Sequence, residues 1–186
     1  MMVRRSRVFH VGLCAALLSA PPALADPQAS VGVTTGLALE DLAGPRSVLP
    51  AFHLGVRGDL LLLRTSPRSM GLGPYVHVAT EAFESADLGG GLSWLIPALE
   101  DLPIVLSAGG FARTGQGRSW SAGLQGDVFA GSRSYNFHSP YGMALGFFAQ
   151  TLVIPDPPAT VDLVLGVRVD AEVLALPVLF VVNAFR

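Results

Sequence analysis

Residues 161–173 read VDLVLGVRVDAEV, and this stretch decides the fold. Its odd-numbered residues are all apolar, whereas its even-numbered residues include three carboxylates and one guanidinium. A β-strand points successive side chains to opposite faces and so separates the two sets, while an α-helix would scatter the charges around its circumference. The stretch is also longer than the usual strand of a soluble domain and has the length with which a tilted strand crosses a hydrocarbon layer. It therefore predicts a long amphipathic strand of the kind found in membrane barrels.

The amino terminus has the layout of a secretory signal. Arginines at positions 4, 5 and 7 precede an apolar run over 8–18, and Ala23-Leu24-Ala25 has the small-x-small pattern that a signal peptidase cuts. The run is too short for a transmembrane anchor, and two prolines follow it. Cys14, the single cysteine, follows Leu13 and does not fit a lipoprotein signal. We expect residues 1–25 to be removed, which leaves 26–186 as one domain without disulfides.

The composition is apolar, but the apolar residues are dispersed. The chain is 51% hydrophobic and 14% charged, with a mean hydropathy of +0.51. Beyond the signal no uninterrupted apolar run reaches the roughly 20 residues that a spanning helix needs. A barrel resolves this conflict, because it spreads apolar residues over alternate positions of many strands. The formal net charge is −2 and no basic patch is evident, so nucleic acid is not an expected partner.

The same alternation recurs along the rest of the chain, with glycine, proline and serine turn signals between the segments. The predicted strands are 29–39, 51–64, 71–82, 87–96, 103–114, 120–130, 141–150 and 161–173. The alternation is weakest in segment 103–114, because Val105 and Phe111 place apolar side chains on its polar face. About eight strands over residues 29–174 predict an all-β, up-and-down antiparallel transmembrane barrel.

The polar face distinguishes two kinds of barrel. A soluble, lipocalin-like periplasmic cup has its apolar face inside, whereas a membrane barrel has it outside. Here the polar face is rich in glycine and carries charges of both signs, which suits a crowded lumen where ions must pair. The aromatic residues expected at interface girdles near strand ends are Tyr75, Trp94, Trp120, Tyr141 and the pair Tyr135 and Phe137. The predicted lumen cluster is Arg57, Asp59, His77, Glu81, Arg113, Asp127, Arg168, Asp170 and Glu172.

In strand pattern and length, nearly all of the chain after the signal resembles the small outer-membrane β-barrels of Gram-negative bacteria, the OmpA, OmpX and OmpW type. This resemblance implies an outer-membrane location, contact with outer-membrane lipid and with the assembly machinery, and a monomer. Such barrels often end on an aromatic residue, but here Arg186 follows Phe185. The tail 175–186 also lacks alternation, and Pro177 favours a short apolar helix lying against the barrel end or the interface.

Catalysis is not expected, and neither is a cofactor. The best catalytic candidate is His138-Ser139, with Glu81 or Asp127 as an orienting group. The lipid A deacylases use a His-x-Ser motif, and here Pro140 occupies the position of that serine. His77 beside Glu81 is read as a packed lumen pair, with a proton switch as the alternative. His53, Asp59 and His77 lack a recognised metal-ligand spacing.

The connections expected on the outer side, near 40–50, 84–87, 114–118 and 155–158, are short, which weakens an adhesin or phage-receptor role. The predicted function is therefore a structural or envelope barrel. The glycines of the lumen leave two alternatives open: a narrow pore, or a niche for lipid or a small hydrophobic molecule.

Overall fold

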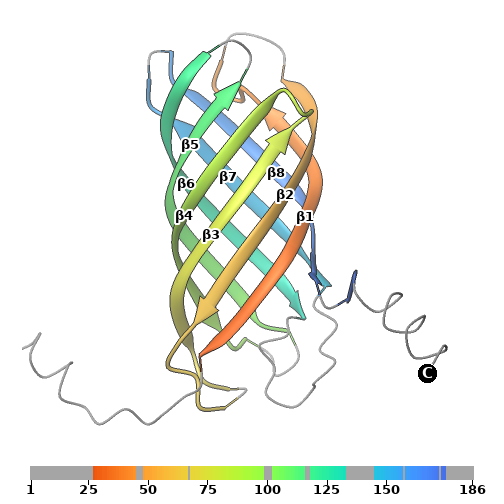
Figure 1. Ribbon diagram of the computed structural model, residues 1–186, viewed down its shortest axis with the longest axis vertical. Coiled ribbons are helices and arrows are strands. Elements are labelled where there is room, and N and C mark those ends of the chain that lie inside the picture. The colour runs from red at the N-terminus through yellow and green to blue at the C-terminus, as the bar shows by residue number, and fades with distance from the viewer. Residues whose placement is uncertain are drawn as a thin grey trace, which may run out of the picture.

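Eight antiparallel strands form one closed barrel, in which each strand pairs with its neighbours in the chain and β8 returns to pair with β1 (Figure 1). The computed structural model describes residues 27–44, 48–66, 68–98, 102–115, 118–132, 145–156, 158–171 and 173–174. The strands are β1 (Gln28–Glu40), β2 (Leu49–Leu61), β3 (Gly71–Glu81), β4 (Ser85–Ile96), β5 (Ile104–Gly115), β6 (Arg118–Ser132), β7 (Leu145–Ile154) and β8 (Thr160–Asp170).

The predicted up-and-down barrel is confirmed, and most strand ends lie within a few residues of their predicted places. β7 continues to Ile154, beyond the predicted end at residue 150. β8 ends at Asp170 instead of 173, and Ala171 and Val173 have helical backbone. The alternation in the sequence continues to residue 173, but the strand ends earlier because it has no hydrogen-bonding partner there. The ladders of β8 with β1 and β7 reach only Asp170 and Val169.

The proposed signal segment 1–25 and the tail 175–186 lie outside the described residues. Within the described part of the chain, none of the helices is long and apolar enough to cross a bilayer.

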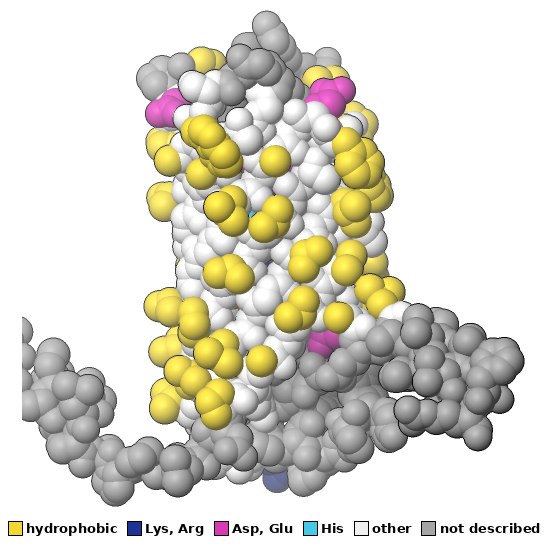
Figure 2. All heavy atoms as spheres, in the orientation of Figure 1, with side chains coloured by type: hydrophobic (Ala, Val, Ile, Leu, Met, Phe, Trp, Pro, Cys, Tyr) yellow, Lys and Arg dark blue, Asp and Glu magenta, His cyan; other side chains and the backbone are white. Residues whose placement is uncertain are grey.

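The exterior of the barrel is apolar and the interior is polar. On β8, Leu165 is 45% exposed, whereas Asp162, Arg168 and Asp170 are buried. Figure 2 shows hydrophobic side chains spread over the barrel wall from one end to the other. The exposed apolar belt includes Val31, Leu37, Phe52, Val56, Leu72, Val76, Val78, Leu88, Leu92, Leu124, Val128, Leu145, Phe147 and Leu165. This polarity is the reverse of what a soluble, lipocalin-like cup requires.

Aromatic rings fill the space above the interior glycines. His77 opposes Gly89 in the β3–β4 ladder, and Phe148 opposes Gly166 in the β7–β8 ladder. A Cβ at Gly166 would lie 2.8 Å from Cε1 of Phe148, so the ring occupies the place of a side chain. Phe111 similarly covers Gly123, which explains why this residue broke the predicted alternation of its strand. The glycines therefore admit rings into a narrow lumen, and the lumen of an eight-stranded barrel is just wide enough to be filled in this way.

Buried apolar side chains form a layer in the interior at the end where the chain enters and leaves the barrel. Val105 opposes both Leu95 and Phe129 in its two ladders, and all three side chains are almost fully buried. Leu61, the last residue of β2, is 1% exposed and belongs to the same buried cluster. Val105 is the other residue that interrupted the predicted alternation of its strand. It points inward, where its neighbours in this layer are also apolar.

Candidate functional site

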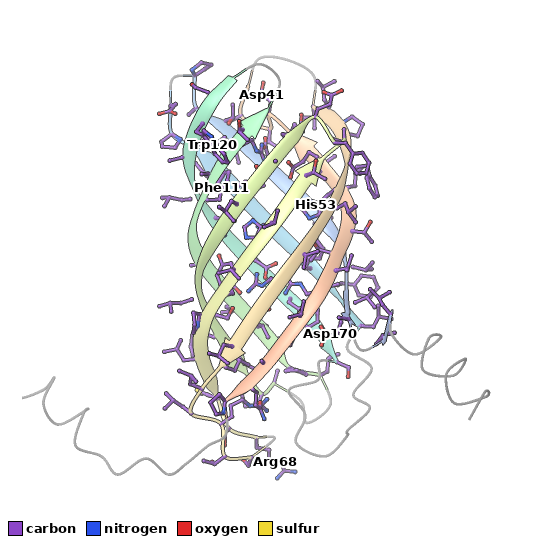
Figure 3. The ribbon with its side chains drawn as sticks, viewed as in Figure 1. Asp41, His53, Arg68, Phe111, Trp120 and Asp170 are labelled. Atoms are coloured by element: carbon purple, nitrogen blue, oxygen red, sulfur yellow. The ribbon has the colours of Figure 1, made fainter. Side chains whose placement is uncertain are left out.

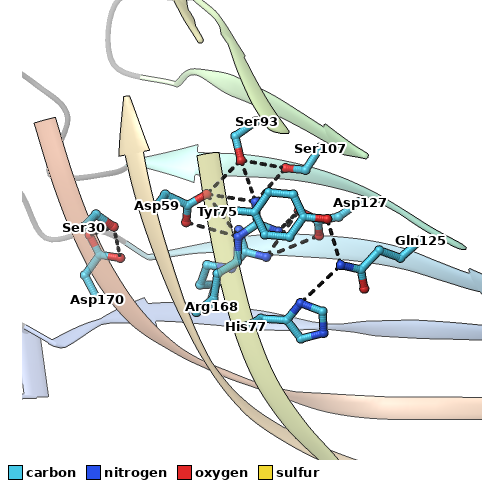
Figure 4. A network of polar contacts seen from close by, with 11 residues as sticks. Ser30, Asp59, Tyr75, His77, Ser93, Ser107, Gln125, Asp127, Arg168 and Asp170 are labelled. Atoms are coloured by element: carbon cyan, nitrogen blue, oxygen red, sulfur yellow. Dashed lines mark hydrogen bonds and ion pairs between the residues drawn. The ribbon is translucent and has the colours of Figure 1, made fainter. Parts of the chain in front are cut away.

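One group of polar side chains, called the proximal cluster, lies in the barrel interior above this apolar layer (Figure 4). Arg57 on β2 is its hub: Nη2 donates to Asp59 Oδ1 at 2.8 Å and to the hydroxyls of Ser93 and Ser107 at 2.8 and 2.6 Å. Nη1 donates to Asp127 Oδ1 at 3.0 Å. One guanidinium thus connects β2, β4, β5 and β6. The proximal cluster comprises Arg57, Asp59, Ser93, Ser107, Asp127 and Arg168.

Two arginines of the proximal cluster are also covered by aromatic rings. The Cζ atom of Arg57 lies 3.9 Å from the centre of the Tyr75 ring. Arg168 donates to both oxygens of Asp127 at 3.3 Å, and its Cζ atom lies 5.2 Å from the Phe129 ring centre and 5.4 Å from that of Phe148. Ion pairing and ring contact together compensate for taking these cations out of water.

A neutral layer of amides follows along the axis. The side-chain amide of Gln125 donates to the Tyr75 hydroxyl at 2.8 Å and lies 3.3 Å from Nδ1 of His77. Gln150 in turn donates to Gln125 Oε1 at 3.1 Å. His77 stacks beside Tyr75, with ring centres 6.3 Å apart. This layer joins β3, β6 and β7 without any formal charge on the amides.

A second charged group, the distal cluster, lies toward the end of the barrel opposite the termini. Arg113 on β5 binds Asp87 through two hydrogen bonds of 2.7 Å, donates to Asp162 Oδ2 at 2.5 Å, and lies 3.5 Å from Glu81 Oε2. Paired, charge-assisted hydrogen bonds of this type are the strongest that side chains form. The distal cluster comprises His53, Glu81, Asp87, Arg113 and Asp162.

The histidine that contacts Glu81 is His53 and not His77. His53 Nδ1 lies 3.4 Å from Glu81 Oε1, and its Nε2 lies 3.2 Å from the Thr34 hydroxyl. The prediction that His77 and Glu81 form a pair is wrong, because residues four apart on one strand are separated by about 13 Å along it. The β2–β3 register instead places His53 directly opposite Glu81.

The structure places eight of the nine predicted lumen residues inside the barrel, and Glu172 lies outside the described residues. Arg57, Asp59, Asp127 and Arg168 form the charged part of the proximal cluster, and Asp170 accepts a 3.4 Å hydrogen bond from Ser30 nearby. Glu81 and Arg113 belong to the distal cluster, and His77 lies in the amide layer. The sequence prediction missed the roles of His53, Asp87, Asp162, Gln125 and Gln150, although the alternation puts each of them on an inward-facing position.

Of the aromatic residues expected at interface girdles, Tyr75 is the one whose predicted place is wrong among those that the structure describes. It is 3% exposed and points into the lumen, because the odd-numbered residues of β3 face inward. Trp94 and Trp120 do face outward, at 44% and 62% exposure, near the ends of β4 and β6. Tyr135, Phe137 and Tyr141 lie outside the described residues.

The described side chains of the interior are linked to one another by ion pairs and hydrogen bonds. Among the described residues, no three His, Cys, Asp or Glu side chains are grouped to hold a metal ion. Asp127 and Glu81, the two candidate orienting groups, both bind arginines. The His138-Ser139 candidate falls outside the described residues. These contacts connect strands across the barrel: Arg57 links β2 to β6 through Asp127, and Arg113 links β5 to β8 through Asp162.

No protein-family model and no curated protein matches the chain. The solved structures that resemble it include two at low identity. One comes from a study of the de novo design of transmembrane β-barrels, with 10% identity, 76% of this chain and 95% of the other covered, and a TM-score of 0.40. The other is Ail, the attachment invasion locus protein of Yersinia pestis, solved with the heparin analogue sucrose octasulfate, with 9% identity, 78% and 99% coverage, and a TM-score of 0.42.

Proposed function

We propose that this chain is an outer-membrane β-barrel protein with a structural role in the envelope. The observation that carries the proposal is the inverted polarity of the barrel. The outward-facing strand positions whose side chains the structure describes are uncharged, while the charged side chains of the proximal and distal clusters are buried and paired. In water this belt would aggregate, and in lipid it is the stable arrangement.

Closure of the sheet supports the same environment. β8 pairs with β1, so the barrel has no open edge and its strand backbone bonds are satisfied within the wall. Hydrocarbon provides no partner for an unpaired backbone group, so a closed barrel is one of only two architectures that span membranes. The signal-like start of the sequence and the outward-facing Trp94 and Trp120 near strand ends fit an exported barrel with aromatic girdles.

The filled lumen favours a structural role over transport. Arg57, Arg113 and Arg168 lie in the interior together with the rings that cover the glycines, and each arginine is bound to carboxylates from other strands. An eight-stranded barrel with such an interior has no room for free diffusion. We therefore expect no steady conductance when the folded chain is added to a planar lipid bilayer. A narrow pore is the second candidate, because the polar side chains extend along the axis through both clusters, and reproducible current steps would favour it.

The experiment that tests membrane insertion is cell fractionation combined with gel migration. The expressed chain is expected in the outer-membrane fraction, and without boiling it should migrate faster than the boiled form, as compact barrels do. Recovery as a detergent-independent soluble protein would overturn the proposal. Within the same proposal the protein is a monomer, inserted by the outer-membrane assembly machinery and surrounded by outer-membrane lipid. An unchanged lipid A mass after overexpression is expected, since the role proposed here is not enzymatic.

A further inference from the structure

The connection between β2 and β3, described over residues 62–66 and 68–70, lies at the terminus end of the barrel and is held by hydrogen bonds. Arg64 is 2% exposed; its Nε donates to the Ser69 carbonyl at 3.2 Å and its Nη1 to Gln28 Oε1 at 3.0 Å. A turn is closed by the Ser69 amide, which donates to the Ser66 carbonyl at 3.0 Å, and the two hydroxyls lie 2.8 Å apart. Arg64 therefore attaches the connection to the start of β1.

The side chains that this connection presents are apolar. Leu63 is 73% exposed and Met70 58% exposed, and they are flanked by Leu62 and Leu72 at 37% and 45%. Leu63 has a φ of 66°, in the left-handed region that non-glycine residues rarely adopt. Leu72 belongs to the apolar belt of β3, so the exposed surface of the connection continues the belt beyond the end of the strands.

Among the described residues, the exposed charged side chain at this end of the barrel is cationic, whereas those at the other end are acidic. Arg68 is exposed, and in Figure 3 it lies at the tip of the connection, away from the barrel. At the opposite end, the described residues that are exposed or half-buried include the acidic Glu40, Asp41, Glu84 and Asp156. A cationic side chain beside exposed apolar ones matches the boundary between acyl chains and phosphate groups, because anionic lipid attracts arginine near the surface.

We infer that the described residues of this connection, 62–66 and 68–70, dock onto anionic phospholipid headgroups, with Leu63 and Met70 among the upper acyl carbons and Arg68 at the phosphates. The inference rests on the proposed function, since it needs a barrel embedded in lipid, and it adds the headgroup chemistry at one end. A bilayer is favoured over a protein partner because the surface is continuous with the belt that faces acyl chains. The acidic residues at the other end would repel the same headgroups, so the barrel has a preferred direction relative to an anionic leaflet.

The test uses the full chain folded into vesicles of phosphatidylcholine, with or without one-third phosphatidylglycerol. The Met70→Trp variant, with Trp94→Phe and Trp120→Phe, reports depth through quenching by lipid brominated near the headgroup. We expect quenching that increases when phosphatidylglycerol is present. Arg68→Gln should lower the docking equilibrium about fivefold in the anionic vesicles, the factor expected for one arginine at such a surface, and have little effect in phosphatidylcholine. In the same background, Glu84→Trp at the opposite end is the matched control and should gain no quenching from phosphatidylglycerol.

Leu63→Asn separates docking from folding. Asparagine tolerates the left-handed backbone at this position, so the variant keeps the shape of the connection while removing the apolar side chain. We expect a normally folded barrel, shown by faster migration of the unboiled form, with reduced quenching at position 70. The decisive outcome concerns the Met70→Trp variant in which Leu63 is unchanged. If that barrel folds but its tryptophan is unquenched, or is equally quenched with and without phosphatidylglycerol, the inference is overturned and the proposed function stays intact. If the full chain fails to insert into any vesicle, the proposed function fails and this inference fails with it.

Discussion

Replacing Arg57 with leucine is the most informative perturbation of this barrel. The guanidinium is 3% exposed and binds Asp59, Asp127, Ser93 and Ser107. Leucine keeps the apolar stem but removes every one of those donors, and Asp59 loses its ion pair while it remains buried. If the lumen is closed to water, this change leaves a carboxylate without its counterion inside the wall.

The magnitude follows from the partners that remain. Breaking a buried ion pair by removing one member costs about 3–5 kcal/mol, because the other charge stays desolvated. Asp127 retains Arg168 at 3.3 Å, and Asp59 retains the Ser93 hydroxyl at 2.9 Å. These remaining contacts place Arg57→Leu near the lower bound, at about 3 kcal/mol. Arg57→Leu combined with Asp59→Leu removes both charges of the closest pair, so we expect the double variant to be more stable than the single one.

The assay is reversible unfolding by urea in phosphatidylcholine vesicles, followed through tryptophan emission and through the fraction that migrates as the compact form. Each variant is compared with the unmodified chain under the same conditions. A loss below about 1 kcal/mol for Arg57→Leu, with no recovery in the double variant, would mean that water reaches Asp59. That result would refute the closed interior and favour the pore.

Three further predictions concern the wall. Val76 is 64% exposed on the belt, so Val76→Arg should lower stability in vesicles by about 2–4 kcal/mol if it lies near the bilayer midplane; Val76→Leu is the control, and equal stability of the two variants would contradict lipid contact. Gly166→Val should reduce the yield of closed barrel, because a side chain there meets the Thr35 carbonyl and the Phe148 ring, whereas Gly126→Ala, with its nearest neighbour at 4.0 Å, should fold normally; similar yields from both would show that the glycines are not needed for closure. Ala82 and Phe83 have φ values of 50° and 61° in the β3–β4 turn, so Asn-Gly at these positions should raise stability by about 1–2 kcal/mol in urea titrations, and a loss would indicate that the Phe83 ring stabilises the turn through Phe52.

Alternation in the sequence predicts which way a side chain points, and it does so well in this barrel because a strand has only two faces. For example, Arg168 and Asp170 belong to the even-numbered residues of 161–173, which were predicted to face inward, and both are buried. Leu165 belongs to the odd-numbered residues and is exposed. The rule was harder to apply at Val105 and Phe111, because both are apolar side chains that point inward. The interior is apolar at the end of the barrel where Val105 lies, and beside Gly123 it contains the Phe111 ring.

Which side chains meet is a different question, because it depends on register between strands. Glu81 pairs with His53 through the β2–β3 ladder, and Arg113 reaches Asp162 on β8 across the lumen. Neither contact has a fixed spacing in the sequence. The two clusters could therefore be predicted as a set of inward-facing charges but not as two separate groups.

The buried charges also favour the correct register between strands, a role that requires no ligand. A slip of β2 by one residue would turn its inward-facing side chains to the opposite face. Arg57 and Asp59 would then face lipid, at a cost of up to about 2–4 kcal/mol for the arginine near the midplane, and Asp127 would lose a partner. The same slip between purely apolar and small side chains would cost far less. Because Arg57 and Arg113 each bind carboxylates on strands that are not their neighbours, the two clusters fix the alignment of the wall as a whole. Ion pairs that a soluble protein could replace with leucine are in this barrel the groups that distinguish the correct closure from a shifted one.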